Sequence, residues 1–91
     1  MKIEFDSQKD RINRQKHGMS LAAAEGMDFL TAQIIPDDRR DYGEARLWAI
    51  APIGDRLHIL TFTMRGDTVR AISLRRANDR ERRRYEQRTR P

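Results

Sequence analysis

Alternating polar and apolar residues predict five strands in this chain. Lys2–Phe5 and Ala32–Pro36 are the two short ones. The three longer runs are Glu44–Ile53, Arg56–Arg65 and Thr68–Arg76. Only Gly54-Asp55 and Gly66-Asp67 separate these longer runs. Two-residue connections that contain glycine are typical of tight hairpins, so we expect the three long strands to pair antiparallel.

Helical spacing and capping residues predict two helices between the first two strands. Gln8–His17 is a polar helix with Ile12 as its main apolar contact, and Gly18 is placed to end it. A second helix, Leu21–Phe29, is rich in alanine and follows the N-cap residue Ser20. We expect both helices to pack on one face of the sheet.

The end of the chain predicts a third helix. Asn78 and Glu81 have the spacing of a capping box, and the helix runs from there to about Gln87. The segment Asp37–Gly43 is too charged to bury and is predicted to be a loop. The resulting order is β-α-α-β-β-β-β-α, an α+β fold with a small, mainly antiparallel sheet.

The two hairpins also predict which side chains share a face. If both turns have two residues, Ile53 lies opposite Arg56 and Arg65 lies opposite Thr68. These two pairs fix the register of each hairpin and therefore the partner of every other residue along its strands. The apolar face that results contains Ala45, Leu47, Ala49, Leu60, Phe62, Met64, Val69 and Ala71. We expect this face to receive the first two helices.

The opposite face is chemically mixed. One end of it collects Glu44, Arg46, Trp48, Thr61, Thr63, Arg65 and Arg70, and the other end collects Ile50, Ile59, Ile72 and Leu74. Arginine neutralises phosphate, an indole stacks on a base, and threonine hydroxyls bond to sugar or phosphate. The alternative is an ordinary solvated face with the cross-strand pairs Glu44–Arg65 and Arg46–Thr63, in which the last helix covers Trp48.

The composition excludes several kinds of catalytic site and metal site. The chain has 91 residues, which suit a single domain over residues 1–91, and it has no cysteine and only two histidines. Thiol catalysis and cysteine-ligated metal sites are therefore excluded, and we expect no metal and no cofactor. No apolar run has the length of a membrane helix, and the start lacks a signal-peptide pattern, so we expect a cytoplasmic protein.

The positive charge is concentrated at one end. Residues 1–64 hold nine basic and ten acidic side chains, whereas residues 65–91 hold ten arginines and four acidic side chains. Such an end predicts a nucleic-acid partner or an acidic protein partner. A solvated helix whose charge only aids solubility is the alternative.

Three further side chains have two interpretations each. His17 ends the first helix, where a cation complements the helix dipole, and the structural interpretation is favoured over acid–base catalysis. His58 lies beside Ala51 and Arg75 in the predicted register, and its structural interpretation is favoured over a functional one. Tyr85 is the only apolar side chain of the arginine-rich last helix: either it pins that helix over the sheet, or the helix is a free surface for a partner.

The chain resembles the BrnT family of toxins from type II toxin–antitoxin systems. The matching strings run in order through nearly the whole chain. They are Ile3-Glu4-Phe5-Asp6, Lys9, Asn13, Lys16-His17-Gly18, Asp37-Asp38-Arg39, Asp41-Tyr42-Gly43-Glu44, Arg46, Thr63, Arg65-Gly66-Asp67, Arg70, Ile72-Ser73, Arg75-Arg76-Ala77, Glu81 and Tyr85.

The resemblance implies a RelE-like fold, with a helix pair on one face of a small sheet and a terminal helix after the last strand. It also implies ribonuclease activity and neutralisation by a BrnA-like antitoxin. The toxin–antitoxin complex is expected to bind operator DNA as a two-plus-two assembly, and the free toxin to be monomeric.

The implied chemistry fits the residues, because RNA carries its own nucleophile, the 2′-hydroxyl. We assign Arg65 and Arg70 to the scissile phosphate, and Glu44 is the nearest candidate for the general base in the predicted register. Tyr85 and His17 are further acid–base candidates if folding brings them to the face. The RNA-binding candidates are Arg46, Trp48, Thr61, Thr63, Arg75 and Arg76.

A competing hypothesis is a non-catalytic, arginine-rich module that binds nucleic acid or an acidic protein. It predicts salt-dependent affinity without turnover. A passive binder should be tolerated when it is expressed in bacteria, whereas a toxin should not.

Overall fold

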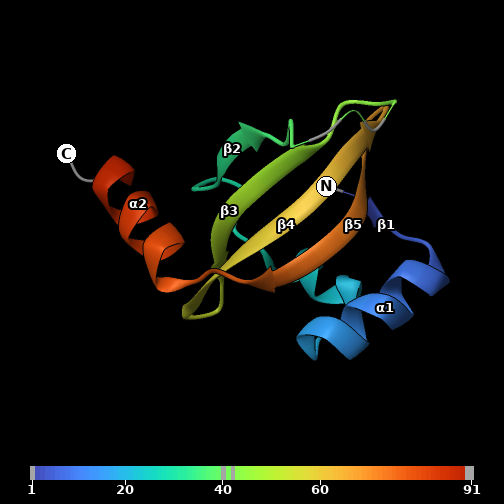
Figure 1. The fold of residues 1–91 in the computed structure, drawn as a ribbon, viewed down its shortest axis with the longest axis horizontal. Helices are drawn as coiled ribbons and strands as arrows, with labels where there is room; N and C mark the ends of the chain where they lie inside the picture. Colours follow the sequence, from blue (N-terminus) through green and yellow to red (C-terminus); the bar gives the residue numbers. More distant parts are fainter. Residues whose placement is uncertain (1, 40, 42, 90–91) are drawn as a thin grey trace.

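The computed structural model of the protein describes residues 2–39, 41 and 43–89, and a five-stranded sheet forms its centre (Figure 1). The strands are β1 (Lys2–Glu4), β2 (Gln33–Pro36), β3 (Leu47–Ile53), β4 (Arg56–Arg65) and β5 (Thr68–Arg76). Their order across the sheet is β1-β5-β4-β3-β2. Only β1 runs parallel to its neighbour, so the prediction of an α+β fold with a mainly antiparallel sheet is confirmed.

The first helix, α1 (Ser7–His17), agrees closely with the prediction. Asp6 caps its start, and Gly18 ends it with φ 71°, a conformation that glycine adopts without strain. The predicted second helix was wrong in type and length. It is a 3-10 helix, η1 (Leu21–Gly26), because Met27 takes an extended conformation and forms a β-bridge with Ile53.

The last helix, α2 (Asp79–Thr89), begins at the predicted capping box. The Glu81 amide donates to the Asn78 side chain at 2.8 Å, and the Asn78 amide donates to Glu81 Oε1 at 2.9 Å. In Figure 1, α2 lies on the side of β3 and β2, far from α1. Within the described residues, no helix is long and apolar enough to cross a membrane.

Both hairpins have the predicted two-residue turns. Gly54 and Gly66 have φ 63° and 59°, as tight turns of this kind require. The predicted β3–β4 register holds along the whole pairing. The predicted β4–β5 register holds from the turn as far as the pair Phe62–Ala71.

A β-bulge between Thr61 and Phe62 then shifts the β4–β5 register by one residue. The bulge moves Leu74 from the mixed face, where it was predicted, to a position opposite Leu60 in the core. It also places Arg75 opposite Ile59, on the same face as Trp48, and turns Arg76 toward His58. The predicted pairing of Arg75 with His58 was therefore wrong.

The core fills the apolar face of the sheet beneath η1. It is built from Leu21, Ala24, Met27, Ala49, Ala51, Leu60, Phe62, Val69, Ala71 and Leu74. Two predicted members near the β4–β5 turn are not covered: Ala45 is exposed and Met64 is 44% exposed.

A polar side chain, Asn13, fastens α1 to the edge of the sheet. Ile12, the predicted apolar contact, is 52% exposed, whereas Asp10 and Asn13 are buried. The Asn13 amide donates to the Leu74 carbonyl at 2.9 Å and accepts from the Leu74 N–H at 2.9 Å. Because β1 pairs with β5 only as far as Arg70, this amide takes the place of a neighbouring strand. The expectation that α1 covers the apolar face was thus wrong, since α1 lies along the β5 edge.

Candidate nucleic-acid cleavage site

A cavity of about 360 Å³ opens between the C-terminal end of α1 and the mixed face of the sheet. We call it the cationic pocket. It is lined by Lys16, His17, Arg39, Arg46, Trp48, Thr61, Ile72, Ser73 and Arg75. Five of the eleven residues that the sequence marked as site candidates meet here, and they come from α1, β3, β4, β5 and the segment before β3.

Two features of the backbone bring these residues together. The Asn13–Leu74 hydrogen bonds hold the last turns of α1 against the second half of β5. The bulge in the β4–β5 pairing turns Arg75 to the Trp48 face. The C-terminal residue of α1, His17, therefore shares a pocket with Arg75, although the two are far apart in sequence.

His17 has electrostatic surroundings that favour its neutral form. Partial burial is the largest cause and lowers the pKa of His17 below its ordinary value of 6.5. The positive charges of Arg75 and Lys16 lower this pKa further. The shift favours the unprotonated imidazole, which can act as a general base beside a phosphate.

Arg75 is fixed by a two-point ion pair with Glu81 of α2. Both N–O distances are 2.8 Å. The hydrogen bonds to Glu81 raise the pKa of Arg75 and, reciprocally, lower the pKa of Glu81. The Arg75 guanidinium lies over the Trp48 ring, 5.9 Å from its centroid, so the first turn of α2 positions both side chains.

Arg39 lies over the same indole, with its guanidinium 5.0 Å from the ring centroid. Its two-point contact with Asp37, at 2.7 and 2.9 Å, explains why the predicted loop begins with a buried carboxylate. The expectation that this segment is too charged to bury was wrong at Asp37, because Arg39 lowers its pKa and satisfies both oxygens. Tyr42, part of the same predicted loop, lies outside the described residues.

The Trp48 indole is therefore not an open platform. Two guanidinium groups lie over its ring. Its N–H is buried and makes no hydrogen bond within the described part of the chain. A stacked base would contact the indole only beside these arginines or after one of them moves.

The predicted phosphate ligands Arg65 and Arg70 lie on the same face but outside the cationic pocket. Arg65 pairs with Glu44 at 3.9 Å, and both side chains are about half exposed. Arg70 pairs with Glu4 at 3.2 Å. The Glu44–Arg65 pair is the one expected of a solvated face, and such exposed pairs contribute little to stability.

Three other site candidates lie outside the cationic pocket and have other contacts. Thr63 is buried and donates its hydroxyl to the Ala45 carbonyl at 2.8 Å. Tyr85 donates its hydroxyl to the Thr31 carbonyl at 3.0 Å, so it pins α2 beside β2, as one interpretation expected. Arg76 lines a different cavity with Asp79, away from the cationic pocket.

Four pocket residues were missed as site candidates: the polar Lys16, Arg39 and Ser73, and the apolar Ile72. Lys16 precedes His17 at the end of a helix, and Arg39 follows two acidic residues in the charged loop. A break in alternation, with apolar residues at Val69, Ala71 and Leu74, could have revealed the bulge that brings Ser73 to the pocket.

Chemically, the cationic pocket offers a neutral imidazole, an ammonium group and three guanidinium groups around a polar cavity. These groups can bind a phosphodiester, accept a proton and stabilise added negative charge. Within the part of the chain that the structure describes, no three His, Cys, Asp or Glu side chains gather to hold a metal ion.

Comparison with known proteins identifies the family of the chain. Residues 5–81 match the model of the ribonuclease toxin BrnT of type II toxin–antitoxin systems. The crystal structure of the Brucella abortus ribonuclease toxin BrnT is similar, with a TM-score of 0.69 and 31% sequence identity over 87% of this chain and 99% of that chain. The chain matches none of the curated proteins with which it was compared. By its sequence and its fold, the chain belongs to the BrnT family of ribonuclease toxins of type II toxin–antitoxin systems.

Proposed function

We propose that the protein is a metal-independent endoribonuclease whose catalytic site is the cationic pocket, and that it inhibits translation by cutting RNA in the cytoplasm. The supporting observation is the placement of His17 beside Arg75 and Lys16, with a pKa that keeps the imidazole neutral. A base and several cations are what attack by a 2′-hydroxyl on its neighbouring phosphate requires. Membership of a ribonuclease toxin family supports the same reaction class.

In the proposed reaction, His17 removes the proton from the 2′-hydroxyl of RNA. The bond from O2′ to phosphorus forms while the bond from phosphorus to O5′ breaks, and Lys16 gives a proton to the departing O5′. Arg75 and Arg46 hold the non-bridging oxygens and stabilise the charge that grows on them. The products are a 2′,3′-cyclic phosphate and a 5′-hydroxyl end.

The pairs at the β4–β5 turn extend this site. Arg65 and Arg70 lie on the same face as the pocket, and each already has a carboxylate neighbour. We assign them to phosphates farther along the RNA strand, not to the scissile one. Glu44 is half exposed and paired with Arg65, so it is the second candidate for the base.

A BrnA-like antitoxin is the proposed partner. Type II systems pair a toxin with a protein antitoxin, and an acidic antitoxin segment over the mixed face would shield its arginines. Operator binding by the complex, its two-plus-two stoichiometry, a monomeric free toxin and the RelE-like relationship of the fold remain predictions from the family resemblance.

End-group analysis of RNA cut in the presence of EDTA tests the proposed function. The purified protein is expected to cut a single-stranded RNA, leaving cyclic phosphate and 5′-hydroxyl ends. A substrate with one 2′-deoxynucleotide at the main cut position is the matched control, because it lacks the nucleophile there and should resist. RNA that stays intact in EDTA, or is bound in a salt-dependent way without being cut, would contradict the proposal and support the binding-module hypothesis.

A further inference from the structure

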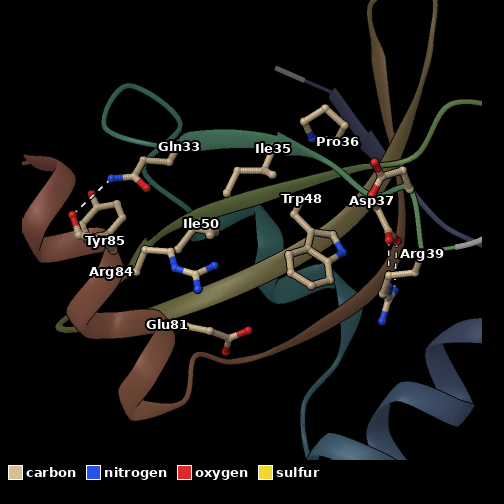
Figure 2. Close-up of a pocket in the computed structure, with 11 residues that line it drawn as sticks. Gln33, Ile35, Pro36, Asp37, Arg39, Trp48, Ile50, Glu81, Arg84 and Tyr85 are labelled. Atoms are coloured by element: carbon tan, nitrogen blue, oxygen red, sulfur yellow. Dashed lines mark hydrogen bonds and ion pairs between the residues drawn. The ribbon is translucent and has the colours of Figure 1, made fainter.

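A second cavity lies directly beside the cationic pocket, between α2 and the strands β2 and β3 (Figure 2). It has a volume of about 170 Å³, and we call it the apolar slot. Ile35, Pro36 and Ile50 form its sheet side, and Tyr85 of α2 closes one end. Trp48 lines both this slot and the cationic pocket, so the two cavities share a wall.

The rim of the slot is polar, and two of its carboxylates already have arginine partners: Asp37 pairs with Arg39, and Glu81 pairs with Arg75. Asp38 and the strong donor Arg84 also line it. Figure 2 shows the Arg84 side chain extending from α2 toward the sheet. Among the described residues Arg84 makes no hydrogen bond or ion pair, although its charge helps to lower the pKa of Glu81. The Gln33 amide donates to the Tyr85 carbonyl at 3.2 Å and so holds the helix against β2.

From this arrangement we infer that the apolar slot binds a nucleobase of the RNA substrate, next to the nucleotide that is cut. The inference rests on the proposed function, because it takes the cationic pocket as the phosphate site. A cavity with an apolar wall of Ile35, Pro36 and Ile50 and a polar rim suits an unstacked base, and it adjoins a pocket that suits the phosphates. The Trp48 wall lies where the sugar would connect the two.

The hydrogen-bonding groups at the slot also indicate which class of base it favours. Arg84 can only donate hydrogen bonds, so it favours a base edge that presents oxygen or nitrogen acceptors, whereas the Asp38 carboxylate at the same slot accepts from N–H groups of a base. Guanine offers two adjacent acceptors, O6 and N7, which a guanidinium contacts at two points. Adenine presents an amino donor in place of O6, so we expect guanine to be preferred over adenine in the slot by about tenfold.

Fluorescence of Trp48 gives a direct binding test, since it is the only tryptophan of the chain. The wild-type protein is titrated with an uncleavable all-deoxy oligonucleotide, and separately with an abasic strand of equal length and charge. The slot predicts a clear change of Trp48 emission with the guanine-containing strand and little change with the abasic one. An equal change with both strands overturns the base site while leaving the phosphate site intact, and absence of binding by both overturns the proposed function as well.

A second test measures which base beside the cut the enzyme prefers. Arg84→Gln should reduce the preference for guanine over adenine beside the cut by about tenfold, with little change for an abasic neighbour. Arg83→Gln removes the same charge from an exposed residue of α2 outside the slot, and it should leave the preference unchanged. An unchanged preference in Arg84→Gln, or equal losses in both variants, would overturn the inference.

A steric pair completes the test. Ile35→Phe fills the slot, whereas Ile34→Phe adds the same bulk to the neighbouring residue on the other face of β2, where Ile34 is 51% exposed. Only Ile35→Phe is expected to weaken the emission change of Trp48 and the base preference. If both variants behave like the wild type, the slot does not hold a base, and an antitoxin side chain becomes the better occupant.

Discussion

The guanidinium of Arg75 and the carboxylate of Glu81 meet at two points, each 2.8 Å apart, and thereby join the last strand to the last helix. The same Arg75 lies over Trp48 and lowers the pKa of His17. One arginine therefore connects α1, the sheet and α2 at the cationic pocket.

Two adjacent arginines of β5 should differ sharply in their effect on cleavage. Arg75→Gln should lower kcat/KM by about 10²-fold, because it removes the donor that we assign to the scissile phosphate. Arg76→Gln should change kcat/KM less than about threefold, because the bulge turns Arg76 away from the pocket. Initial rates on one short RNA substrate, with circular dichroism of both variants, measure this.

Loss of Arg75 also leaves Glu81 without its partner, so folding must be controlled. The double variant Arg75→Gln/Glu81→Gln keeps a neutral hydrogen-bonding pair and should unfold close to the wild-type temperature. If that double variant cuts RNA as well as the wild type, Arg75 has no part in the reaction.

Arg65 and Arg70 should affect binding more than chemistry. Arg65→Gln and Arg70→Gln should raise KM a few-fold with kcat nearly unchanged, because the proposed function assigns these arginines to phosphates outside the pocket. The salt dependence of RNA affinity should also become shallower in each variant. A large fall of kcat in either variant would move the reaction to the β4–β5 turn, where Glu44 would be the base.

Asn13 should be a major determinant of stability despite being polar. Asn13→Ala leaves the Leu74 N–H and carbonyl without partners at the β5 edge, and should lower the free energy of unfolding by about 2–4 kcal/mol. Gln15→Ala, an exposed position of α1, should change it by less than about 0.5 kcal/mol. Urea unfolding followed by circular dichroism compares them, and equal small losses would show that α1 is held in another way.

Acid should destabilise the fold through its paired carboxylates. The pKa values of Glu81 and Asp37 are lowered in the folded state by Arg75 and Arg39 respectively. The unfolded chain therefore takes up protons first as the pH falls, and the stabilisation present above about pH 5 is lost as the pH falls through the folded values. Unfolding temperatures between pH 3 and pH 6 should fall less steeply for Glu81→Gln than for the wild type.

Local patterns predicted most of the scaffold. The two Gly-Asp turns predicted the pairing of β3, β4 and the first part of β5, and the Asn78–Glu81 capping box predicted the start of α2. These features depend on residues that are close in sequence, where backbone preferences and short-range hydrogen bonds dominate.

The parts of the structure that the sequence did not predict depend on contacts between residues far apart in the chain. The position of α1 depends on Asn13 and Leu74, which are 61 residues apart in the chain. The bulge depends on which residue of β5 fits opposite Thr61, and it decides that Arg75 faces the pocket. As a result the mixed face was predicted, but the convergence of His17 and Arg75 was not.

The pH dependence of cleavage by the wild type and by His17→Gln tests the catalytic role of the pocket most directly. The wild-type kcat/KM should rise with pH along an acid limb whose midpoint lies below 6.5, because the lowered pKa of His17 makes the imidazole a base there. His17→Gln should lose about 10²-fold or more in kcat/KM and lose that limb. A His17→Gln variant that keeps the wild-type rate and the same acid limb would contradict the assignment of the cationic pocket as the catalytic site.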